Sequence, residues 1–211
     1  MPTCYLVGAS PEADEAAPRV LTGDCVIAAD GGLDHLRRWG IAPDLVIGDM
    51  DSLNCDLPAD VPYATYPAEK DDTDMALALE EGLRRGFTRF ALLCAAGGRP
   101  DHTMANLQLL VKAARLNAKA ILHMGAWRCT ALCAPSGRSE LWLRGRGIVS
   151  VFAYGGRAKG VMIAGMKYGF TGDLDGATPL GVSNELDDEG RVSLEEGVLL
   201  CYWEEQIEAQ P

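Results

Sequence analysis

The sequence predicts an α/β N-terminal domain with a mostly parallel sheet, followed by a smaller all-β domain. Through residue 125, short apolar runs alternate with stretches of helical spacing, which is typical of a parallel sheet covered by helices on both faces. Beyond that point no long helical stretch follows, and glycine and aspartate separate the apolar runs. The stretch CAPSG at 133–137 lies near the change of pattern, so we expect domains at residues 1–130 and 131–211.

The elements of the first domain follow one another in a regular order. The expected strands are the apolar runs at 4–9, 26–32, 44–52, 63–67, 89–95 and 119–125. Helical spacing with a glycine stop predicts a helix at 33–40. Residues 71–86 start with Asp and Thr and end with Arg-Arg-Gly, which are the start and stop signals of a helix. Residues 101–117 form the next expected helix.

The second domain is expected to contain strands alone. Its apolar runs are at 138–145, 147–154, 160–165, 191–197 and 198–204. The last eight residues, EEQIEAQP, are expected to fray. In the first domain, by contrast, polar clusters follow the carboxyl ends of the strands, where open α/β sheets bind their ligands.

Composition excludes some classes of protein. The net charge of −11 argues against nucleic-acid binding, which needs a basic surface. Seven cysteines without a CxxC pair indicate free thiols in a reducing compartment, although Cys129 and Cys133 have the spacing of half a zinc site. No stretch is long enough to span a membrane, and the first residues do not resemble a signal peptide. We therefore expect a cytoplasmic protein that binds neither membrane nor nucleic acid.

The stretch VIGDMDS at 46–52 ends an apolar run with Asp49 and Asp51. Because side chains alternate along a strand, the two carboxylates would project to the same side. They are either aspartates that cap a turn or a pair of oxygen ligands for Mg²⁺, which leaves coordination sites open for substrate phosphates.

The stretch EKDDTD at 69–74 places four acids at the start of a helix. One or two acids would be enough to compensate the helix dipole. Asp74 would face the space above the sheet, and Thr73 with the free backbone N–H groups could contact phosphate oxygens. Lys70 would add a positive charge.

The stretch AAGGRPDHTMAN at 95–106 joins a strand to a helix. Its glycines, Gly98 among them, allow the backbone to approach a ligand, and Arg99 is a forked phosphate donor. Asp101 is an N-cap or a ligand contact, and Asn106 lies one turn from His102 on nearly the same helix face. Together with the acidic clusters, these residues are typical of a site that transfers phosphoryl groups. No P-loop sequence is present.

These motifs, taken together, resemble the thiamine pyrophosphokinase family. The resemblance runs from about residue 26 to residue 202 and rests on AADGG (28–32), PDLVIGDMDS (43–52), EKDDTDMALAL (69–79), GGRPDHTMANLQLL (97–110), MKYGF (166–170), GVSNEL (181–186) and VSLEEGVLL (192–200). It implies a Rossmann-like N-terminal sheet, a C-terminal β-sandwich and a homodimer with its active sites between subunits. It also implies transfer of pyrophosphate from ATP to thiamine, with Mg²⁺ as cofactor and AMP as the second product.

The resemblance assigns roles to individual residues. The catalytic and metal-binding carboxylates would be Asp49, Asp51 and Asp74. The ATP-binding residues would be Asp30, Lys70, Asp71, Thr73, Gly98, Arg99, Asp101, His102 and Asn106. The thiamine-binding residues would be Ser183 and Asn184. An aromatic side chain should cover the thiamine ring, and the candidates are Trp127, Trp142, Trp203 and Tyr168.

Two other functions are compatible with part of these motifs. A pyrophosphokinase for another alcohol, such as a hydroxymethyl pterin, would also use the GDMDS and PDH segments. A non-catalytic sensor of thiamine or nucleotide would not need its full set of acids. The GVSNEL stretch favours thiamine over the pterin, and the acids favour an active enzyme over the sensor.

Overall fold

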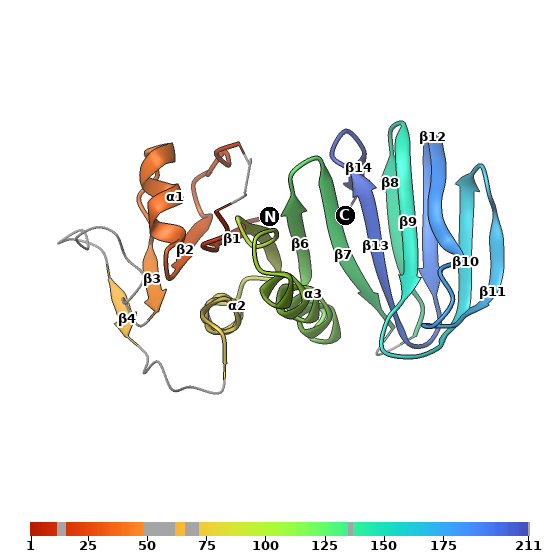
Figure 1. The fold of residues 1–211 in the computed structure, drawn as a ribbon, viewed down its shortest axis with the longest axis horizontal. Coiled ribbons are helices and arrows are strands. Elements are labelled where there is room, and N and C mark those ends of the chain that lie inside the picture. The colour runs from red at the N-terminus through yellow and green to blue at the C-terminus, as the bar shows by residue number, and fades with distance from the viewer. Residues whose placement is uncertain (12–15, 49–61, 66–71, 135–136, 211) are drawn as a thin grey trace. The chain divides into compact units, whose positions relative to one another are not determined.

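A computed structural model describes residues 1–11, 16–48, 62–65, 72–134 and 137–210 (Figure 1). This part of the chain forms three helices and fourteen strands. It divides into two compact units. Unit 1 is Met1–Ala113 with Asn117–Gly125, and unit 2 is Ala114–Leu116 with Ala126–Pro211.

Unit 1 contains six strands that pair in parallel. Their spatial order is β6-β5-β1-β2-β3-β4. The strands are β1 (Cys4–Val7), β2 (Cys25–Ala29), β3 (Leu45–Gly48), β4 (Tyr63–Thr65), β5 (Arg89–Leu93) and β6 (Lys119–Met124). Every residue of β2 and β3 is buried, as the continuous apolar runs predict for strands covered on both faces.

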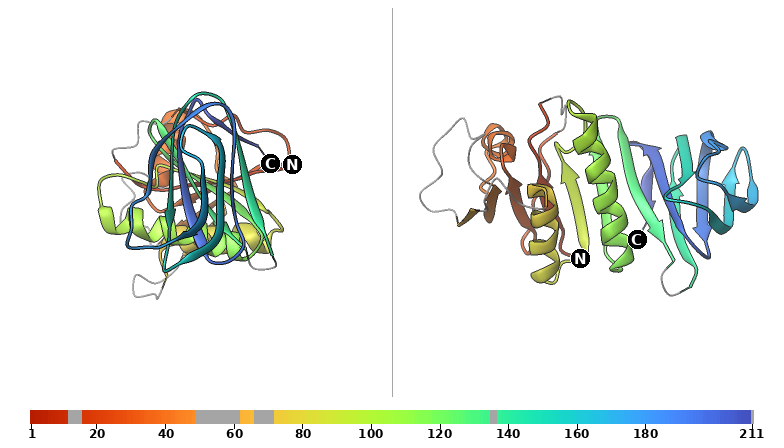
Figure 2. Two further views of the ribbon diagram at one scale, coloured as in Figure 1. Left: turned by 90° about the vertical axis from the view of Figure 1, so that its right-hand side faces the viewer. Right: turned by 60° about the horizontal axis from the view of Figure 1, so that its bottom comes forward.

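Three helices pack on this sheet, α1 (Gly32–Trp39), α2 (Asp74–Arg84) and α3 (Pro100–Arg115). Leu33 and Leu36 of α1 join the cluster formed by Val7 and its neighbours on β2 and β3. Cys4, which projects to the other face of β1 from Val7, lies against α2. Helices α2 and α3 lie side by side (Figure 2, right), joined by an ion pair between Glu80 and Lys112. None of these three helices is long and apolar enough to cross a membrane.

Unit 2 consists of strands that pair antiparallel. They are β7 (Trp127–Cys133), β8 (Ser139–Arg144), β9 (Gly147–Ala153), β10 (Ala158–Met166), β11 (Phe170–Leu174), β12 (Gly181–Leu194), β13 (Val198–Glu204) and β14 (Glu208–Gln210). The 14-residue strand β12 pairs with β9 along its first half and with β8 along its second half. The expectation that the C-terminus frays is wrong for Glu208–Gln210, which pair with β8.

The fold class predicted from the sequence, an α/β domain with a mostly parallel Rossmann-like sheet plus a smaller β-sandwich, is wrong. The described part of the chain is mostly sheet, with 46% of its residues in strands and 19% in helices, and its strands are of mixed direction. The reason lies in the connections. No helix occurs in the described residues between β1 and β2, where a Rossmann-like crossover would have one, and the long antiparallel strands of unit 2 outweigh the short parallel ones.

Candidate active site

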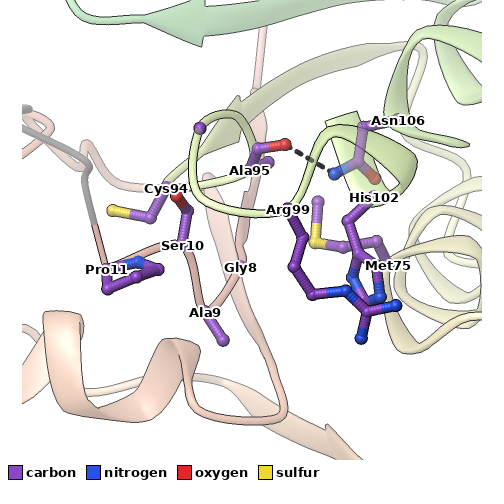
Figure 3. A pocket seen from close by; sticks show the side chains of 11 residues that line it. Gly8, Ala9, Ser10, Pro11, Met75, Cys94, Ala95, Arg99, His102 and Asn106 are labelled. Atoms are coloured by element: carbon purple, nitrogen blue, oxygen red, sulfur yellow. Dashed lines mark hydrogen bonds between the residues drawn. The ribbon is translucent and has the colours of Figure 1, made fainter. Parts of the chain in front are cut away.

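A cavity of about 190 Å³ opens in unit 1 at the carboxyl ends of β1 and β5 (Figure 3). Ser10 and Pro11 line it on the side of β1, and Arg99, His102 and Met75 line it on the other side. The cavity therefore occupies the edge at which parallel sheets bind their ligands.

The floor of the cavity is built from two turns tied together by hydrogen bonds. The Gly8 amide donates to Leu93 O at 2.8 Å, and the Ser10 amide donates to Cys94 O at 2.9 Å. The Ser10 hydroxyl donates to Ala96 O at 2.6 Å. A Cβ on Gly8 would lie 2.7 Å from the Cys94 carbonyl oxygen, so this crossing requires glycine.

Gly8 and Ser10 belong to none of the motifs predicted from the sequence. Their hydrogen-bond partners lie more than 80 positions further along the chain. The bond between Ser10 and Ala96, for example, spans 86 residues. The one local signal is the glycine near the end of the apolar run at 4–9.

Hydrogen bonds between helix α3 and the turn after β5 fix the shape of that turn. Gly97 and Gly98 have φ of 88° and 65°, which glycine adopts without strain. The buried Asn106 donates from Nδ2 to Ala95 O at 2.6 Å, and the Gly97 amide donates to Thr103 Oγ1 at 3.2 Å. The predicted residue Asn106 therefore fixes the turn, and the helix N-terminus faces the same cavity.

Arg99 is the charged side chain most suited to binding an anion here. Its Nε and Nη2 donate to the Asp101 carboxylate at 3.2 and 2.5 Å, while both side chains are largely exposed. The Arg99 hydrogen bonds lower the pKa of Asp101 to about 2, and the same pairing raises the pKa of Arg99. Since exposed ion pairs are weak, Arg99 can exchange Asp101 for a ligand phosphate at little cost.

Other predicted site residues lie at the carboxyl end of β2 and at the amino end of α2. Asp30 follows β2 with φ of 51°, and its amide donates to Ile47 O at 2.7 Å. Thr73 is the N-cap of α2, because its hydroxyl accepts the Ala76 amide at 3.2 Å. Asp74 is half-buried in the first turn, next to the cavity-lining Met75.

The structure brings only part of the predicted site together. Arg99, His102 and Asn106 line the cavity, whereas the other described members of the predicted set do not. Asp49, Asp51, Lys70 and Asp71 lie outside the described residues. Within the described part of the chain, no three His, Cys, Asp or Glu side chains are grouped so that they could hold a metal ion.

In unit 2, the predicted residue Asn184 is buried, and both the oxygen and the nitrogen of its amide bond backbone groups. Its Oδ1 accepts the Tyr168 and Glu185 amides at 2.9 and 3.0 Å, and its Nδ2 donates to Tyr168 O at 2.7 Å. Its neighbour Ser183 is exposed, with φ of 56°, and donates its amide to Ser150 Oγ at 3.0 Å. Asn184 thus clamps the MKYGF segment to the GVSNEL segment.

A pocket of about 150 Å³ adjoins this clamp. It is lined mainly by apolar side chains, and Tyr168 and Leu180, which are each 60% exposed, stand at it. Lys167 pairs with Glu185 at 2.5 Å beside the Tyr168 ring. The clamp therefore sets where the Tyr168 ring stands.

Replacing Asn184 by Ala is expected to lower the free energy of unfolding by about 2 kcal/mol, because partly buried backbone groups lose their partners. Chemical denaturation monitored by tryptophan fluorescence measures the change. Ser183→Ala is the matched control and should change stability by less than about 0.5 kcal/mol, since the Ser183 side chain is exposed. Equal effects of the two substitutions would contradict the clamp.

A glycine-rich turn, an arginine and a helix N-terminus at the carboxyl ends of parallel strands are typical of proteins that bind and transfer phosphorylated groups. Residues 17–122, which include the turn after β5 and helices α2 and α3 but neither β1 nor the loop after it, match the family described as "Thiamin pyrophosphokinase, catalytic domain". The chain belongs to the thiamin pyrophosphokinase family.

Individual relatives agree with this assignment. The chain is 36% identical to the thiamine pyrophosphokinase of Bacillus subtilis over 98 residues, which are 44% of this chain and 46% of that protein. The aligned segment therefore spans less than half of that relative. The solved structure of the B. subtilis enzyme superposes with a TM-score of 0.81 at 22% identity, covering 96% of this chain and 98% of that one. The structure of the thiamin pyrophosphokinase from Geobacillus thermodenitrificans superposes with a TM-score of 0.80 at 26% identity, covering 96% and 97%.

Proposed function

We propose that the protein transfers the pyrophosphoryl group of ATP to the hydroxyl of thiamine, giving thiamine diphosphate and AMP. The observation that carries this proposal is the cavity at the carboxyl ends of β1 and β5, with Arg99 and the N-terminus of α3 directed at it, in a chain of this family. The runner-up activities, a pyrophosphokinase for a pterin alcohol and a non-catalytic sensor, are not favoured by the family assignment.

ATP is assigned to residues 1–130. Gly98, Arg99, Asp101, His102 and Asn106 would receive the nucleotide at the turn after β5, which Asn106 holds in shape through Ala95 O. The remaining ATP-side residues, expected at the start of α2 and the end of β2, are Asp30, Lys70, Asp71 and Thr73. The Thr73 hydroxyl caps α2, so its contribution to phosphate binding is to hold the helix N-terminus in place.

Mg²⁺ is the cofactor that this set of acids would hold, through Asp49, Asp51 and Asp74. Carboxylate oxygens are the ligands that Mg²⁺ prefers, and the half-buried Asp74 at the start of α2 is the described member of the set. When bound, the ion would neutralise charge on the transferred phosphates. The protein's own acids also suit thiamine, whose thiazolium ring is positively charged.

Thiamine is assigned to residues 131–211, with Ser183 and Asn184 at its site. Because the Asn184 amide is committed to Tyr168 and Glu185, its contribution is to position the backbone and the Tyr168 ring. Of the four aromatic candidates for the thiamine ring, Trp203 is only 2% exposed and belongs to the core, whereas Tyr168 is 60% exposed. Tyr168 is therefore the preferred candidate.

The protein's part in the reaction is positioning and charge neutralisation. In-line attack by the thiamine hydroxyl on the β-phosphorus of ATP requires the two reactants to be held in one geometry, with AMP leaving on the far side. The rigid floor of hydrogen-bonded turns holds the phosphates, and Arg99 compensates their charge.

The assembly and location proposed for the protein follow the family. We expect a homodimer with active sites between subunits, in the cytoplasm, with no membrane or nucleic-acid partner. Six cysteines in the described part of the chain are free thiols, which supports a reducing compartment.

Replacing Arg99 by Ala is expected to raise the KM for ATP by about tenfold, because a charge-assisted hydrogen bond to phosphate is lost. The KM for thiamine should change less than twofold, and Arg99→Lys should restore part of the ATP affinity. Initial-rate kinetics with each substrate varied in turn measures these constants. If both KM values rise equally, Arg99 serves structure rather than ATP binding.

The transfer itself is tested by the position of isotopic label. With ATP labelled at the β-phosphorus, the label should appear in thiamine diphosphate, and AMP should be the sole nucleotide product. Formation of ADP, with only the γ-phosphorus passing to thiamine, would contradict transfer of a pyrophosphoryl group.

A further inference from the structure

Cys4 and Cys25 face each other at the amino ends of two neighbouring strands, far along the strands from the candidate active site. They are a direct register pair of the parallel strands β1 and β2, and both are buried free thiols. Register partners on parallel strands project to the same face of a sheet, so the two thiols are neighbours on that face.

The backbone geometry of this pair is compatible with a disulfide. Neighbouring strands lie about 4.8 Å apart, which is within the roughly 4.4–6.8 Å separation of Cα atoms found across disulfides. The Cβ atoms of such a register pair start slightly farther apart than the roughly 3.5–4.5 Å of a relaxed disulfide, so closure would draw the strands together. Such a bond is expected to be readily reduced.

A cation lies against one of the two thiols. Arg85, the C-cap of α2, donates from Nη1 to Cys25 Sγ at 3.5 Å, and Glu81 holds its Nε at 2.7 Å. The pKa of Cys25 is lowered mainly by the hydrogen bond from Cys4, and further by Arg85, against burial and the nearby Asp44. The pKa of Cys4 is raised, so Cys25 is the thiol that ionises first.

We propose that Cys4 and Cys25 form an oxidisable dithiol that closes to a disulfide on reaction with a hydroperoxide. The Cys25 thiolate attacks one peroxide oxygen, so that an S–O bond forms, the O–O bond breaks and hydroxide leaves. The Cys4 sulfur then attacks the Cys25 sulfenic acid, so that the S–S bond forms, the S–O bond breaks and water leaves with the Cys4 proton. Two electrons pass from the two sulfurs to the peroxide. Cys25 is 4% exposed, which leaves access only to a small oxidant.

Peptide mapping of the full chain tests this directly. The protein is treated with hydrogen peroxide, its remaining thiols are blocked with N-ethylmaleimide under denaturing conditions, and it is digested with trypsin. Cys4 and Cys25 fall in separate tryptic peptides, residues 1–19 and 20–37, each with a single cysteine. The expected product is these two peptides cross-linked, lighter than their sum by the mass of two hydrogen atoms and separated by dithiothreitol.

The role of Arg85 has a matched control in the preceding residue. Arg84 and Arg85 both pair with Glu81, but only Arg85 contacts Cys25. Arg85→Gln is expected to slow formation of the cross-link severalfold, because the Cys25 thiolate loses the cation that contacts it, whereas Arg84→Gln leaves the rate unchanged. Cys129 and Cys201, which are fully buried in unit 2, serve as internal controls and should remain thiols.

Three results would overturn the proposal. One is the absence of the cross-linked peptide while Cys25 is recovered as a thiol, and another is Cys25 recovered only as its sulfinic acid. The third is a cross-link from either peptide to a different cysteine in place of the Cys4–Cys25 bond. Equal rates for Arg84→Gln and Arg85→Gln would show that Arg85 does not promote the oxidation of Cys25. None of these measurements uses catalytic turnover, so their outcome is independent of the proposed function.

Discussion

Replacing Asp51 by Asn is expected to lower the rate of thiamine diphosphate formation by about a hundredfold to a thousandfold, the range found when one preorganised group that stabilises transition-state charge is removed. The substitution keeps the size of the side chain but removes the charge that a divalent cation needs. Asp51 lies outside the described residues, so the expectation rests on the spacing of Asp49 and Asp51 and on the family assignment. Steady-state kinetics across a series of Mg²⁺ concentrations measures it.

A matched control separates loss of a ligand from loss of charge near the site. Asp72 is an exposed carboxylate just before α2 to which no role is assigned, and Asp72→Asn should change the rate less than twofold. Binding of Mn²⁺ without nucleotide, followed by electron paramagnetic resonance, should weaken in Asp51→Asn and not in Asp72→Asn. A normally active Asp51→Asn enzyme would contradict the metal assignment.

Replacing Gly32 by Ala is expected to destabilise unit 1 by at least about 3 kcal/mol, the upper end for overpacking. A Cβ at this position would lie 1.9 Å from the Val7 carbonyl oxygen, so the start of α1 and the end of β1 would have to separate. Because that neighbour is backbone, no rotamer change can relieve the contact. Thermal unfolding measures the effect, which corresponds to a lowering of Tm by roughly 6 to 12 °C for a chain of this length.

Gly40 is the control for Gly32, at the other end of the same helix. It has φ of 68°, and a Cβ there would meet no atom within 4 Å. Gly40→Ala should therefore cost only the backbone strain of a left-handed residue, about 1 kcal/mol. If the two alanines cost the same, then the close approach of α1 to β1 does not determine stability.

The helices were the most predictable part of the fold, because their signals are local. The stretches 33–40, 71–86 and 101–117 correspond to α1, α2 and α3, and Thr73 caps α2 as the start signal implies. Strand β12 was not recognised as one element. Its first ten residues are mostly exposed and polar, so they lack the apolar alternation by which a half-buried strand is recognised.

The class of the fold was predicted wrongly for a related reason. Alternating apolar and helical segments predict parallel pairing, and unit 1 does pair in parallel, but the pattern does not reveal how much antiparallel sheet follows or whether each crossover contains a helix. Those features depend on pairings between segments that lie far apart in the sequence. The pairing of β14 with β8 is one that no local pattern predicts.

The candidate site, too, contains residues that the sequence identifies and residues that only the structure reveals. Arg99, His102 and Asn106 lie together because they belong to one turn and one helix, which the sequence identifies as a unit. Gly8 and Ser10 complete the cavity from the loop after β1, which is distant in sequence, and only the folded structure reveals them. For Asn184, the family resemblance implies a ligand contact, whereas its three hydrogen bonds to the backbone indicate a positioning role.

A coupled assay for AMP release is the most direct test that thiamine is the acceptor of pyrophosphate. The purified protein is supplied with ATP and Mg²⁺, and either thiamine, a hydroxymethyl pterin or neither alcohol is added. Thiochrome fluorescence identifies the thiamine product. We expect AMP release that depends on thiamine, with one thiamine diphosphate formed per AMP. AMP release with the pterin alone, or saturable thiamine binding without turnover, would contradict it.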